Sequence, residues 1–397
     1  MKKLTIAVFL FCAALSASAN RLSNNARIYL LTCQPGAEVY ATFGHSALYV
    51  KDAEMGIDAV FNYGIFDFDE ESFLYKFVKG DTYYILGVND IESFLWSYER
   101  RRCGVLAQEL NLTQGEKERL FAALYDNAQP ENRRYLYNFF YDNCATRIRD
   151  IVAENVDGEY LQDNKIAPYT YRELIEQYTK NTWLKFGIDV LVGAPADTLT
   201  NAYDAIMFLP FYLSDNYANI QVARNEYQPS LVAANEIFIP DFPREAPRRN
   251  APLITMLIVL LIAMLVSGYE IRSKRQTLWF DFTLFALAGL VGIVLTFVQF
   301  FSIHPAVFPN YNILWLHPLQ LLFAILLPVK SLRSTLHRYH YFNIIMALAA
   351  AFLGSTLQVF HPAFYPLLGA MVLRGILWIK INRKNESAFA GKRKRSC

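Results

Sequence analysis

The last third of the chain contains five long apolar segments, and these constrain the fold more than any other feature. They cover residues 251–269, 278–301, 312–329, 341–360 and 363–379. Most of them are long enough for a helix to cross the roughly 30 Å hydrocarbon core of a bilayer. The composition, 54% hydrophobic, agrees with a membrane part. We therefore predict an all-α bundle of about five transmembrane helices in residues 251–380, and we expect Arg374, inside the last segment, to snorkel toward the interface.

Basic residues predict the orientation of this bundle. Lys and Arg are concentrated at residues 272–275, 330–338 and 380–395, after the first, third and fifth segments, whereas the loops 304–311 and 361–362 contain none. Loops rich in Lys and Arg stay in the cytoplasm. The chain before the bundle is therefore predicted to lie outside the cytoplasm, and residues 381–397 to form a basic cytoplasmic tail. Orientation explains this tail without a nucleic-acid partner.

Residues 1–19 have the pattern of a secretory signal peptide. Lys2 and Lys3 precede an apolar stretch, and Ala17-Ser18-Ala19 matches the small-residue cleavage motif. The alternative, an uncleaved anchor, also leads to export. We therefore predict that residues 20–250 form an exported, periplasmic domain of a protein of the inner membrane, and that a proline-rich, charged linker ends this domain at 241–250.

The exported part has the pattern of an α+β domain. Alternating or β-branched runs predict strands at residues 27–32, 41–50, 60–66, 82–88 and 105–110. Thr113 with Glu116, and Thr170 with Glu173, have the spacing of capping boxes that begin helices. Helix and loop are expected around 187–189 and 203–213. The exported domain is thus predicted to be of the α+β class.

One stretch of this domain, Tyr135 to Ile151, is suited to hold a reactive sulfur. An aromatic run at 137–141, expected to be a strand, leads into Asp142-Asn143-Cys144, and apolar residues then recur at helical spacing. Cys144 is therefore predicted to begin a helix that Asp142 or Asn143 caps. The free N–H groups and the dipole of a helix start favour a thiolate, and Arg147 adds positive charge. The alternative is a small, buried, inert cysteine.

His45 is the only histidine before the membrane part, and it can serve as the base for Cys144. It lies on a predicted strand, and the cysteine follows later at a helix start. This order is the reverse of that in papain and matches circularly permuted papain-like folds, such as the lecithin:retinol acyltransferase type. A circularly permuted papain-like domain is therefore our expected fold for the exported part.

A third group should orient the imidazole from the neighbouring strand. Asn62 is our choice, because the segment 60–64 is the next predicted strand; Tyr63, Asp67 and Glu38 are alternatives. The Cys144 N–H is expected to stabilise an oxyanion. Other predicted supporting residues are the tyrosines near the two motifs and the basic residue one turn into the helix: Tyr40, Tyr63, Tyr141 and Arg147.

Other polar residues of the exported part suggest no competing chemistry. Cys33 and Cys103 could form a disulfide in an oxidising compartment, or remain two separate thiols. The carboxylates between 67 and 71 fit a solvated turn. The sequence contains neither an H-E-x-x-H motif nor paired C-x-x-C motifs, so we expect no metal and no other cofactor.

The membrane part contains a second group of polar residues, around the outer end of its third apolar segment. Polar groups at this depth tend to line sites or to pair with one another. They are therefore a possible substrate site, or alternatively an interfacial belt of aromatic and polar side chains. The group consists of His304, Asn310, Asn312, Trp315 and His317.

Several of these stretches together resemble a known family, the Bacteroides-type lipoprotein N-acyltransferases (Lnb). The resemblance lies in FGHSALYV (43–50), VFNYGIF (60–66), FYDNCATR (140–147), TYREL (170–174), FGIDVLVGAPAD (186–197) and FLP (208–210). It implies an exported papain-like domain joined to a multi-span part. It also implies N-acylation of diacylated lipoproteins, with a membrane phospholipid as the acyl donor.

The residues fit the same reaction, in which a phospholipid acyl group passes through a Cys144 thioester to the α-amino group of a lipidated N-terminal cysteine. Two other interpretations stay open. One is a membrane-anchored thiol hydrolase, either a cell-wall amidase or a protease, because a fold alone does not decide function. The other is a non-enzymatic envelope sensor or assembly factor.

Overall fold

The computed structural model describes residues 21–66, 72–161, 169–200, 203–224, 227–244 and 249–393. The predicted signal peptide and Asp67 lie outside these residues. Contacts divide the chain into two compact units, the first formed by Met1–Tyr169 with Leu199–Arg244 and the second by Thr170–Thr198 with Glu245–Cys397. The sequence pattern predicts one domain up to residue 250, but the contacts assign Thr170–Thr198 to the helical unit.

The first unit is built on a seven-stranded antiparallel sheet with the order β6-β4-β3-β2-β1-β5-β9. The five predicted strands are confirmed as its continuous centre, and the two edge strands were missed. A separate pair consists of β7 (Glu159–Leu161) and β8 (Gln221–Ala223). The sheet strands are β1 (Arg27–Cys33), β2 (His45–Asp52), β3 (Ile57–Ile65), β4 (Tyr83–Asn89), β5 (Val105–Leu110), β6 (Arg134–Leu136) and β9 (Val232–Ile239).

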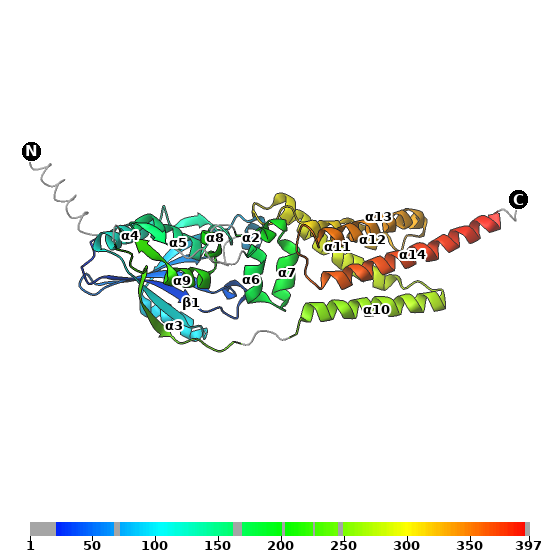
Figure 1. Cartoon of the computed structure of the whole chain (residues 1–397). Coiled ribbons are helices and arrows are strands. Elements are labelled where there is room, and N and C mark those ends of the chain that lie inside the picture. Colours follow the sequence, from blue (N-terminus) through cyan, green and yellow to red (C-terminus); the bar gives the residue numbers. More distant parts are fainter. Residues whose placement is uncertain are drawn as a thin grey trace, which may run out of the picture. The chain divides into compact units, whose positions relative to one another are not determined.

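Helices cover both faces of this sheet, as Figure 1 shows for α3 and α4. On one face, α3 (Ile91–Arg100) contributes Phe94 to a core with Leu31 and Ala47. On the other face, α4 (Gln114–Asn127) packs Phe121 against Phe61, while α5 (Cys144–Asn155) contacts β2 and β3 and α9 (Pro210–Asn219) contacts β1. Because both faces are covered, β1 is buried along almost its whole length.

The remaining elements of the first unit are short helical segments. They are η1 (Val39–Ala41), α2 (Phe73–Lys79) and α8 (Tyr203–Ile206). The segment that precedes His45 is therefore a 3-10 turn rather than the predicted strand from residue 41, and β2 begins at His45 itself. His45 consequently stands at the end of a rigid strand, where a side chain can reach beyond the sheet.

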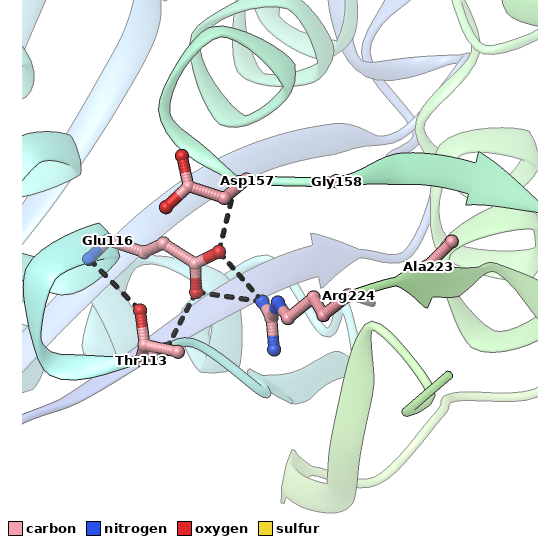
Figure 2. Close-up of a pocket in the computed structure, with 6 residues that line it drawn as sticks. All are labelled: Thr113, Glu116, Asp157, Gly158, Ala223 and Arg224. Carbon is pink, nitrogen blue, oxygen red and sulfur yellow. Dashed lines mark hydrogen bonds and ion pairs between the residues drawn. The ribbon is translucent and has the colours of Figure 1, made fainter. Parts of the chain in front are cut away.

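Figure 2 shows a small pocket of about 270 Å³ in this unit, near the start of α4. At this pocket the buried carboxylate of Glu116 accepts hydrogen bonds from the backbone of Thr113 and Asp157 and from Arg224, whose Nη2 lies 2.7 Å from Oε2. The predicted capping box is thus confirmed, and it also ties the end of α5 and the strand β8 to α4. Because these hydrogen bonds already occupy the carboxylate oxygens of Glu116, the polar groups that line the pocket have a structural role.

The elements of the second unit, within its described residues, are all helices joined by loops. Three of its helices are long and apolar enough to cross a membrane: Ala251–Ser273, Leu278–Phe301 and Phe364–Ile381. The unit contains α6 (Tyr171–Thr179), α7 (Trp183–Leu191), η2 (Ala194–Asp197), α10 (Ala251–Ser273), α11 (Leu278–Phe301), η3 (Tyr311–Leu314), α12 (Leu319–Leu326), η4 (Lys330–Leu332), α13 (Arg333–Leu353) and α14 (Phe364–Arg393).

The third predicted span, 312–329, is divided in the structure. It comprises η3, a break, and α12, which starts after Pro318. Proline lacks a backbone donor and disfavours helical geometry at the residue before it, so an uninterrupted helix cannot run through this position without strain. The fourth, 341–360, lies mostly within α13. As membrane spans, both segments remain predictions.

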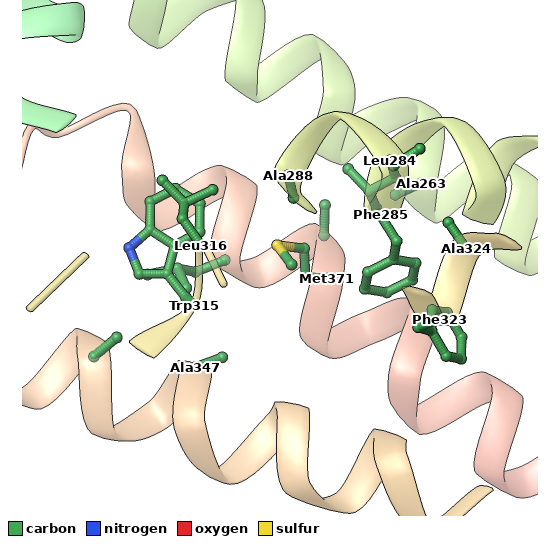
Figure 3. Close-up of a cluster of buried hydrophobic side chains, with 14 of the residues drawn as sticks. Ala263, Leu284, Phe285, Ala288, Trp315, Leu316, Phe323, Ala324, Ala347 and Met371 are labelled. Atoms are coloured by element: carbon green, nitrogen blue, oxygen red, sulfur yellow. The ribbon is translucent and has the colours of Figure 1, made fainter. Parts of the chain in front are cut away.

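Apolar side chains join the helices of this unit, as Figure 3 illustrates. Phe285 of α11 meets Phe323 of α12 edge to face, with 4.9 Å between ring centroids. Gly289 and Gly292 of α11 lie directly against the backbone around Leu321 and His317, where a Cβ atom would collide. Close helix packing at small residues is typical of membrane bundles.

Arg374 does not snorkel, and this prediction is wrong. Its side chain is 1% exposed and forms ion pairs with Asp281 of α11 at 2.6 Å and Glu270 of α10 at 2.9 Å, with a further bond to Ser267. Two carboxylates within the bundle stabilise the guanidinium there, so it has no need to reach an interface.

A second buried ion cluster explains much of the TYREL and FGIDVLVGAPAD stretches. Arg172 of α6 bonds Asp189 of α7 and Asp197 of η2, each at 2.7 Å, and also the carbonyls of Val192 and Gly193. Lys185 reaches Asp189 at 2.6 Å. These conspicuous charges therefore hold α6, α7 and η2 together.

Candidate active site

Cys144 begins α5, as predicted, and the capping residue is Asn143. Its Oδ1 accepts the N–H groups of Ala145 and Thr146, and the Thr146 hydroxyl accepts the Asn143 N–H in return. Asp142 instead forms a two-pronged ion pair with Arg147 at 2.6 and 2.8 Å. The helix start is thus fixed on both sides of the cysteine, whose own side chain is only half-buried.

His45 and Asn62 meet beside this cysteine. The imidazole Nε2–H donates to Asn62 Oδ1 at 2.6 Å, and the ring also forms a hydrogen bond with the Cys144 side chain. With Nε2 held by Asn62, Nδ1 is the nitrogen left for the sulfur. The structure therefore brings together the three residues that we predicted as nucleophile, base and orienting group.

The surroundings favour an ionised pair. Burial alone would raise the pKa of Cys144, but His45 and the N–H groups of Ser46 and Ala145 lower that pKa below its usual value. Burial opposes a charged His45, but Cys144 and Asn62 raise its pKa overall. A thiol with a lowered pKa beside an imidazole with a raised one is suited to act as a nucleophile near neutral pH.

Gly64 leaves open the space at which this site converges. Its φ is +97°, and the β3–β4 pairing shifts register around it. A Cβ built on Gly64 would lie 3.6 Å from Cε1 of His45, 3.8 Å from Cβ of Cys144 and 3.9 Å from the hydroxyl oxygen of Tyr135. A side chain at this position would therefore contact all three groups, and glycine leaves the point between them open.

Two other predicted supporting tyrosines are largely exposed, and a role for them at the site stays a prediction. Tyr40 is 55% exposed on η1 and packs near Phe66, and Tyr141 is 48% exposed in the turn before α5. The run 137–141 is not the expected strand, because Asn138 and Asp142 close a turn with reciprocal backbone hydrogen bonds. The turn directs these aromatic residues differently from an alternating strand.

The tyrosine that the sequence analysis missed is Tyr135, on β6. It is 5% exposed, and Cys144 contributes to its raised pKa, after burial. Its ring lies edge-on to Tyr63, with 6.2 Å between centroids, and beneath the Arg147 guanidinium at 3.8 Å. Tyr63 and Arg147, both predicted as supporting residues, thus touch the site through Tyr135. The signal available in the sequence was its place at the start of the cysteine stretch.

Comparison with known families identifies the chain. Residues 17–177 match the Lnb N-terminal periplasmic domain, and residues 245–386 match the Lnb transmembrane domain. The chain belongs to the Lnb family. It is accordingly a membrane protein with a periplasmic portion. No curated protein and no solved structure matched it.

In this Lnb family member, three of the polar residues predicted as a membrane-face substrate site form hydrogen bonds inside the second unit. Asn310 and Asn312 donate to backbone carbonyls at the end of α7, with Asn310 Nδ2 2.9 Å from the Val190 oxygen, and Trp315 donates to Asn312. All three are almost fully buried. This bonding favours the interpretation that these polar groups pair with one another, and it argues against the interpretation that they line a substrate site.

The two histidines of that group differ from the asparagines. His304 is half-buried after α11, and His317 is 8% exposed against the rings of Tyr339 and Phe342. Neither ring nitrogen of His317 has a hydrogen-bond partner among the described residues. A substrate role for this pair stays a prediction.

Cys33 and Cys103 are both free thiols in the structure, so the separate-thiol alternative holds there. Both are buried in the α3-side core. Burial raises the pKa of Cys33 far above the usual value of a thiol. Cys33 therefore provides a contrast to Cys144, since it remains a protonated, inert packing residue.

Proposed function

We propose that this chain is an apolipoprotein N-acyltransferase. It would move a fatty acyl group from a membrane phospholipid to the α-amino group of the lipidated N-terminal cysteine of a lipoprotein. The observation that carries the proposal is the Cys144–His45–Asn62 arrangement in a chain that belongs to the Lnb family. The residues themselves perform the reaction in two half-reactions, and the proposal requires no cofactor.

In the first half-reaction the Cys144 thiolate attacks the carbonyl carbon of the phospholipid ester. The C–S bond forms, the carbonyl oxygen becomes an oxyanion, and collapse breaks the ester C–O bond. His45, held by Asn62 through its Nε2–H, gives its proton to the departing glycerol oxygen. The products are a lysophospholipid and an acyl thioester on Cys144.

In the second half-reaction the amine of a diacylated lipoprotein attacks the thioester carbonyl. His45 takes the proton from the attacking nitrogen, and collapse of the oxyanion releases the Cys144 thiolate. Both substrates are lipid-anchored, so joining the periplasmic domain to a membrane part raises their effective concentration at the sulfur. This requirement accounts for a membrane anchor much larger than a soluble hydrolase needs.

The finer architecture belongs to the same proposal. We infer a circularly permuted papain-like arrangement of the first unit, because His45 on a strand precedes Cys144 at a helix start. We also infer five membrane spans in the inner membrane, with the first unit in the periplasm and a cytoplasmic C-terminus. Reporter fusions at Lys274 and Leu336 should then give cytoplasmic signals, and a fusion at Pro309 a periplasmic one.

The intermediate provides the direct test of function. Purified protein incubated with phospholipid alone should gain a fatty-acyl mass on the Cys144 peptide, and neutral hydroxylamine should remove it. A diacylated lipopeptide with a free α-amine should then accept the acyl group, whereas an N-blocked lipopeptide should not. Mass spectrometry of the peptide and of the lipopeptide measures both events.

Matched cysteine variants sharpen this test. Cys144→Ala should gain no acyl group, and Cys33→Ala, which removes a buried thiol, should be acylated normally. Release of the acyl group only to water, despite a competent lipopeptide, would contradict the transferase and favour a thiol hydrolase. Absence of any adduct on the wild-type protein would favour a non-enzymatic role.

A further inference from the structure

The hydroxyl of Tyr135 is placed at the reacting centre by two fixed neighbours. Its ring packs edge-on to Tyr63, whose own hydroxyl accepts a 3.0 Å bond from Asn127. The other neighbour is Arg147, which lies 3.8 Å over the ring and is itself held by both carboxylate oxygens of Asp142. Such a clamp leaves the phenol little freedom to turn away.

This hydroxyl has no hydrogen-bond partner among the described residues, although it is buried. A buried polar group without a partner costs about 1–3 kcal/mol, so proteins rarely retain one without a role. The hydroxyl oxygen borders the space that Gly64 leaves open, because it lies 3.9 Å from the position that a Cβ would take there. His45 and Cys144 border the same space.

We propose that Tyr135 donates a hydrogen bond to the carbonyl oxygen of the acyl group as Cys144 is acylated and deacylated. The inference rests on the proposed function and deepens it by naming a residue of the oxyanion hole. In each half-reaction the carbonyl oxygen gains negative charge when the new bond to carbon forms, and loses it when the tetrahedral adduct collapses. Tyr135 keeps its proton throughout, so the proton transfers remain those of His45.

The chemistry of the phenol agrees with a donor rather than a base. Burial and the nearby Cys144 raise the pKa of Tyr135 well above its usual value, so the hydroxyl stays protonated at neutral pH. The Arg147 cation over the ring withdraws negative charge, which strengthens the O–H as a donor. A donor preorganised toward a developing oxyanion lowers the barrier, whereas it adds little to the ground state.

The test separates carbonyl chemistry from thiolate reactivity. Tyr135→Phe keeps the ring between Tyr63 and Arg147 and removes only the hydroxyl. Acylation of Cys144 by phospholipid should become slower by about 10²–10³-fold, as expected for loss of one oxyanion donor. Alkylation of Cys144 by iodoacetamide, which develops no oxyanion, should keep the wild-type rate.

Tyr84→Phe is the matched control, because Tyr84 pairs with Tyr135 across the strands and is also a buried tyrosine. This variant should acylate and alkylate at wild-type rates. Two results would overturn the proposal. One is acylation of Tyr135→Phe at the wild-type rate. The other is a rate of alkylation that falls as far as the rate of acylation, which would show that Tyr135 only supports Cys144 and His45. If Tyr135→Phe unfolds, the substitution Tyr135→3-fluorotyrosine is tested in its place. Acylation slower than in the wild type, at an unchanged rate of alkylation, would then refute the proposed role of Tyr135 as a hydrogen-bond donor.

A second substrate keeps this result independent of the proposed function. If wild-type protein takes no acyl group from phospholipid, the transferase proposal fails. The p-nitrophenyl ester of a short fatty acid then serves as a generic acyl donor for Cys144. A slower p-nitrophenol burst with Tyr135→Phe than with wild type would still support the oxyanion role, and equal bursts would refute it.

Discussion

Replacing Asn62 by alanine should slow acyl transfer by roughly 10- to 150-fold without abolishing it. The bond that is lost joins Asn62 Oδ1 to His45 Nε2 at 2.6 Å. A hydrogen bond to a charged group contributes about 1.5–3 kcal/mol, and each 1.36 kcal/mol in a barrier changes the rate about tenfold. The nucleophile and its base both remain, so part of the activity should persist.

The same variant should narrow the pH range of activity from both sides. Asn62 raises the pKa of His45, and the charged imidazole in turn lowers the pKa of Cys144. Without Asn62 the thiolate should form only at higher pH, which shifts the acidic limb upward. His45 should also lose its proton at lower pH, which shifts the alkaline limb of acyl transfer downward.

Two measurements check these shifts. Iodoacetamide alkylation of Cys144 against pH follows the acidic limb, and acylation by phospholipid against pH follows both limbs. Asn111→Ala is a suitable control, because the Asn111 side chain bonds the Ser230 carbonyl and not the site. Unchanged rates and limbs in Asn62→Ala, with the fold retained by circular dichroism, would refute the orienting role.

Two further substitutions address the backbone and the helical unit. Gly64→Ala should lose about 1–3 kcal/mol of stability from its positive φ and also acylate slowly; Gly56→Ala, another positive-φ glycine but with open space around it, should lose stability and acylate normally. Equal rates of acylation of Gly64→Ala and Gly56→Ala, measured by mass spectrometry, would refute the argument that the reaction uses the space left open by Gly64. Asp189→Asn removes the buried carboxylate that pairs with Arg172 and Lys185. It should destabilise the protein by about 3–5 kcal/mol, as measured by thermal unfolding. A loss of stability no larger than that of the control Asp150→Asn, at an exposed position, would contradict this.

Local patterns in the sequence are sufficient to predict the centre of the sheet and the meeting of the candidate catalytic residues. The cap, the helix start and a solitary histidine are each defined within a few residues of sequence. The proximity of Cys144, His45 and Asn62 in the structure can therefore be predicted from the amino-acid sequence alone. The edge strands β6 and β9 cannot, because a three-residue strand carries little periodicity and both strands depend on partners far along the chain.

The errors about buried charges concern long-range pairing. In the hydropathy pattern, Arg374 is a charge near the end of an apolar segment. Asp281 and Glu270 come to lie beside it only when the helices α10, α11 and α14 pack together. Similarly, the charges of the segment 170–198 look like those of a soluble surface, yet they pair with one another in the helical unit. A residue's neighbours in sequence do not reveal which distant acceptors neutralise it.

Structural residues can be separated from candidate catalytic ones by asking whether the polar groups of their side chains have hydrogen-bond partners. Asn312 and Arg172 are conspicuous in the sequence, but backbone carbonyls and carboxylates already occupy their donors. Among the described residues, the Tyr135 hydroxyl lacks such a partner, and its oxygen borders the space that Gly64 leaves open beside Cys144. A donor that meets its full partner only when the carbonyl oxygen becomes an oxyanion stabilises the transition state more than the bound substrate, and this difference is what catalysis requires.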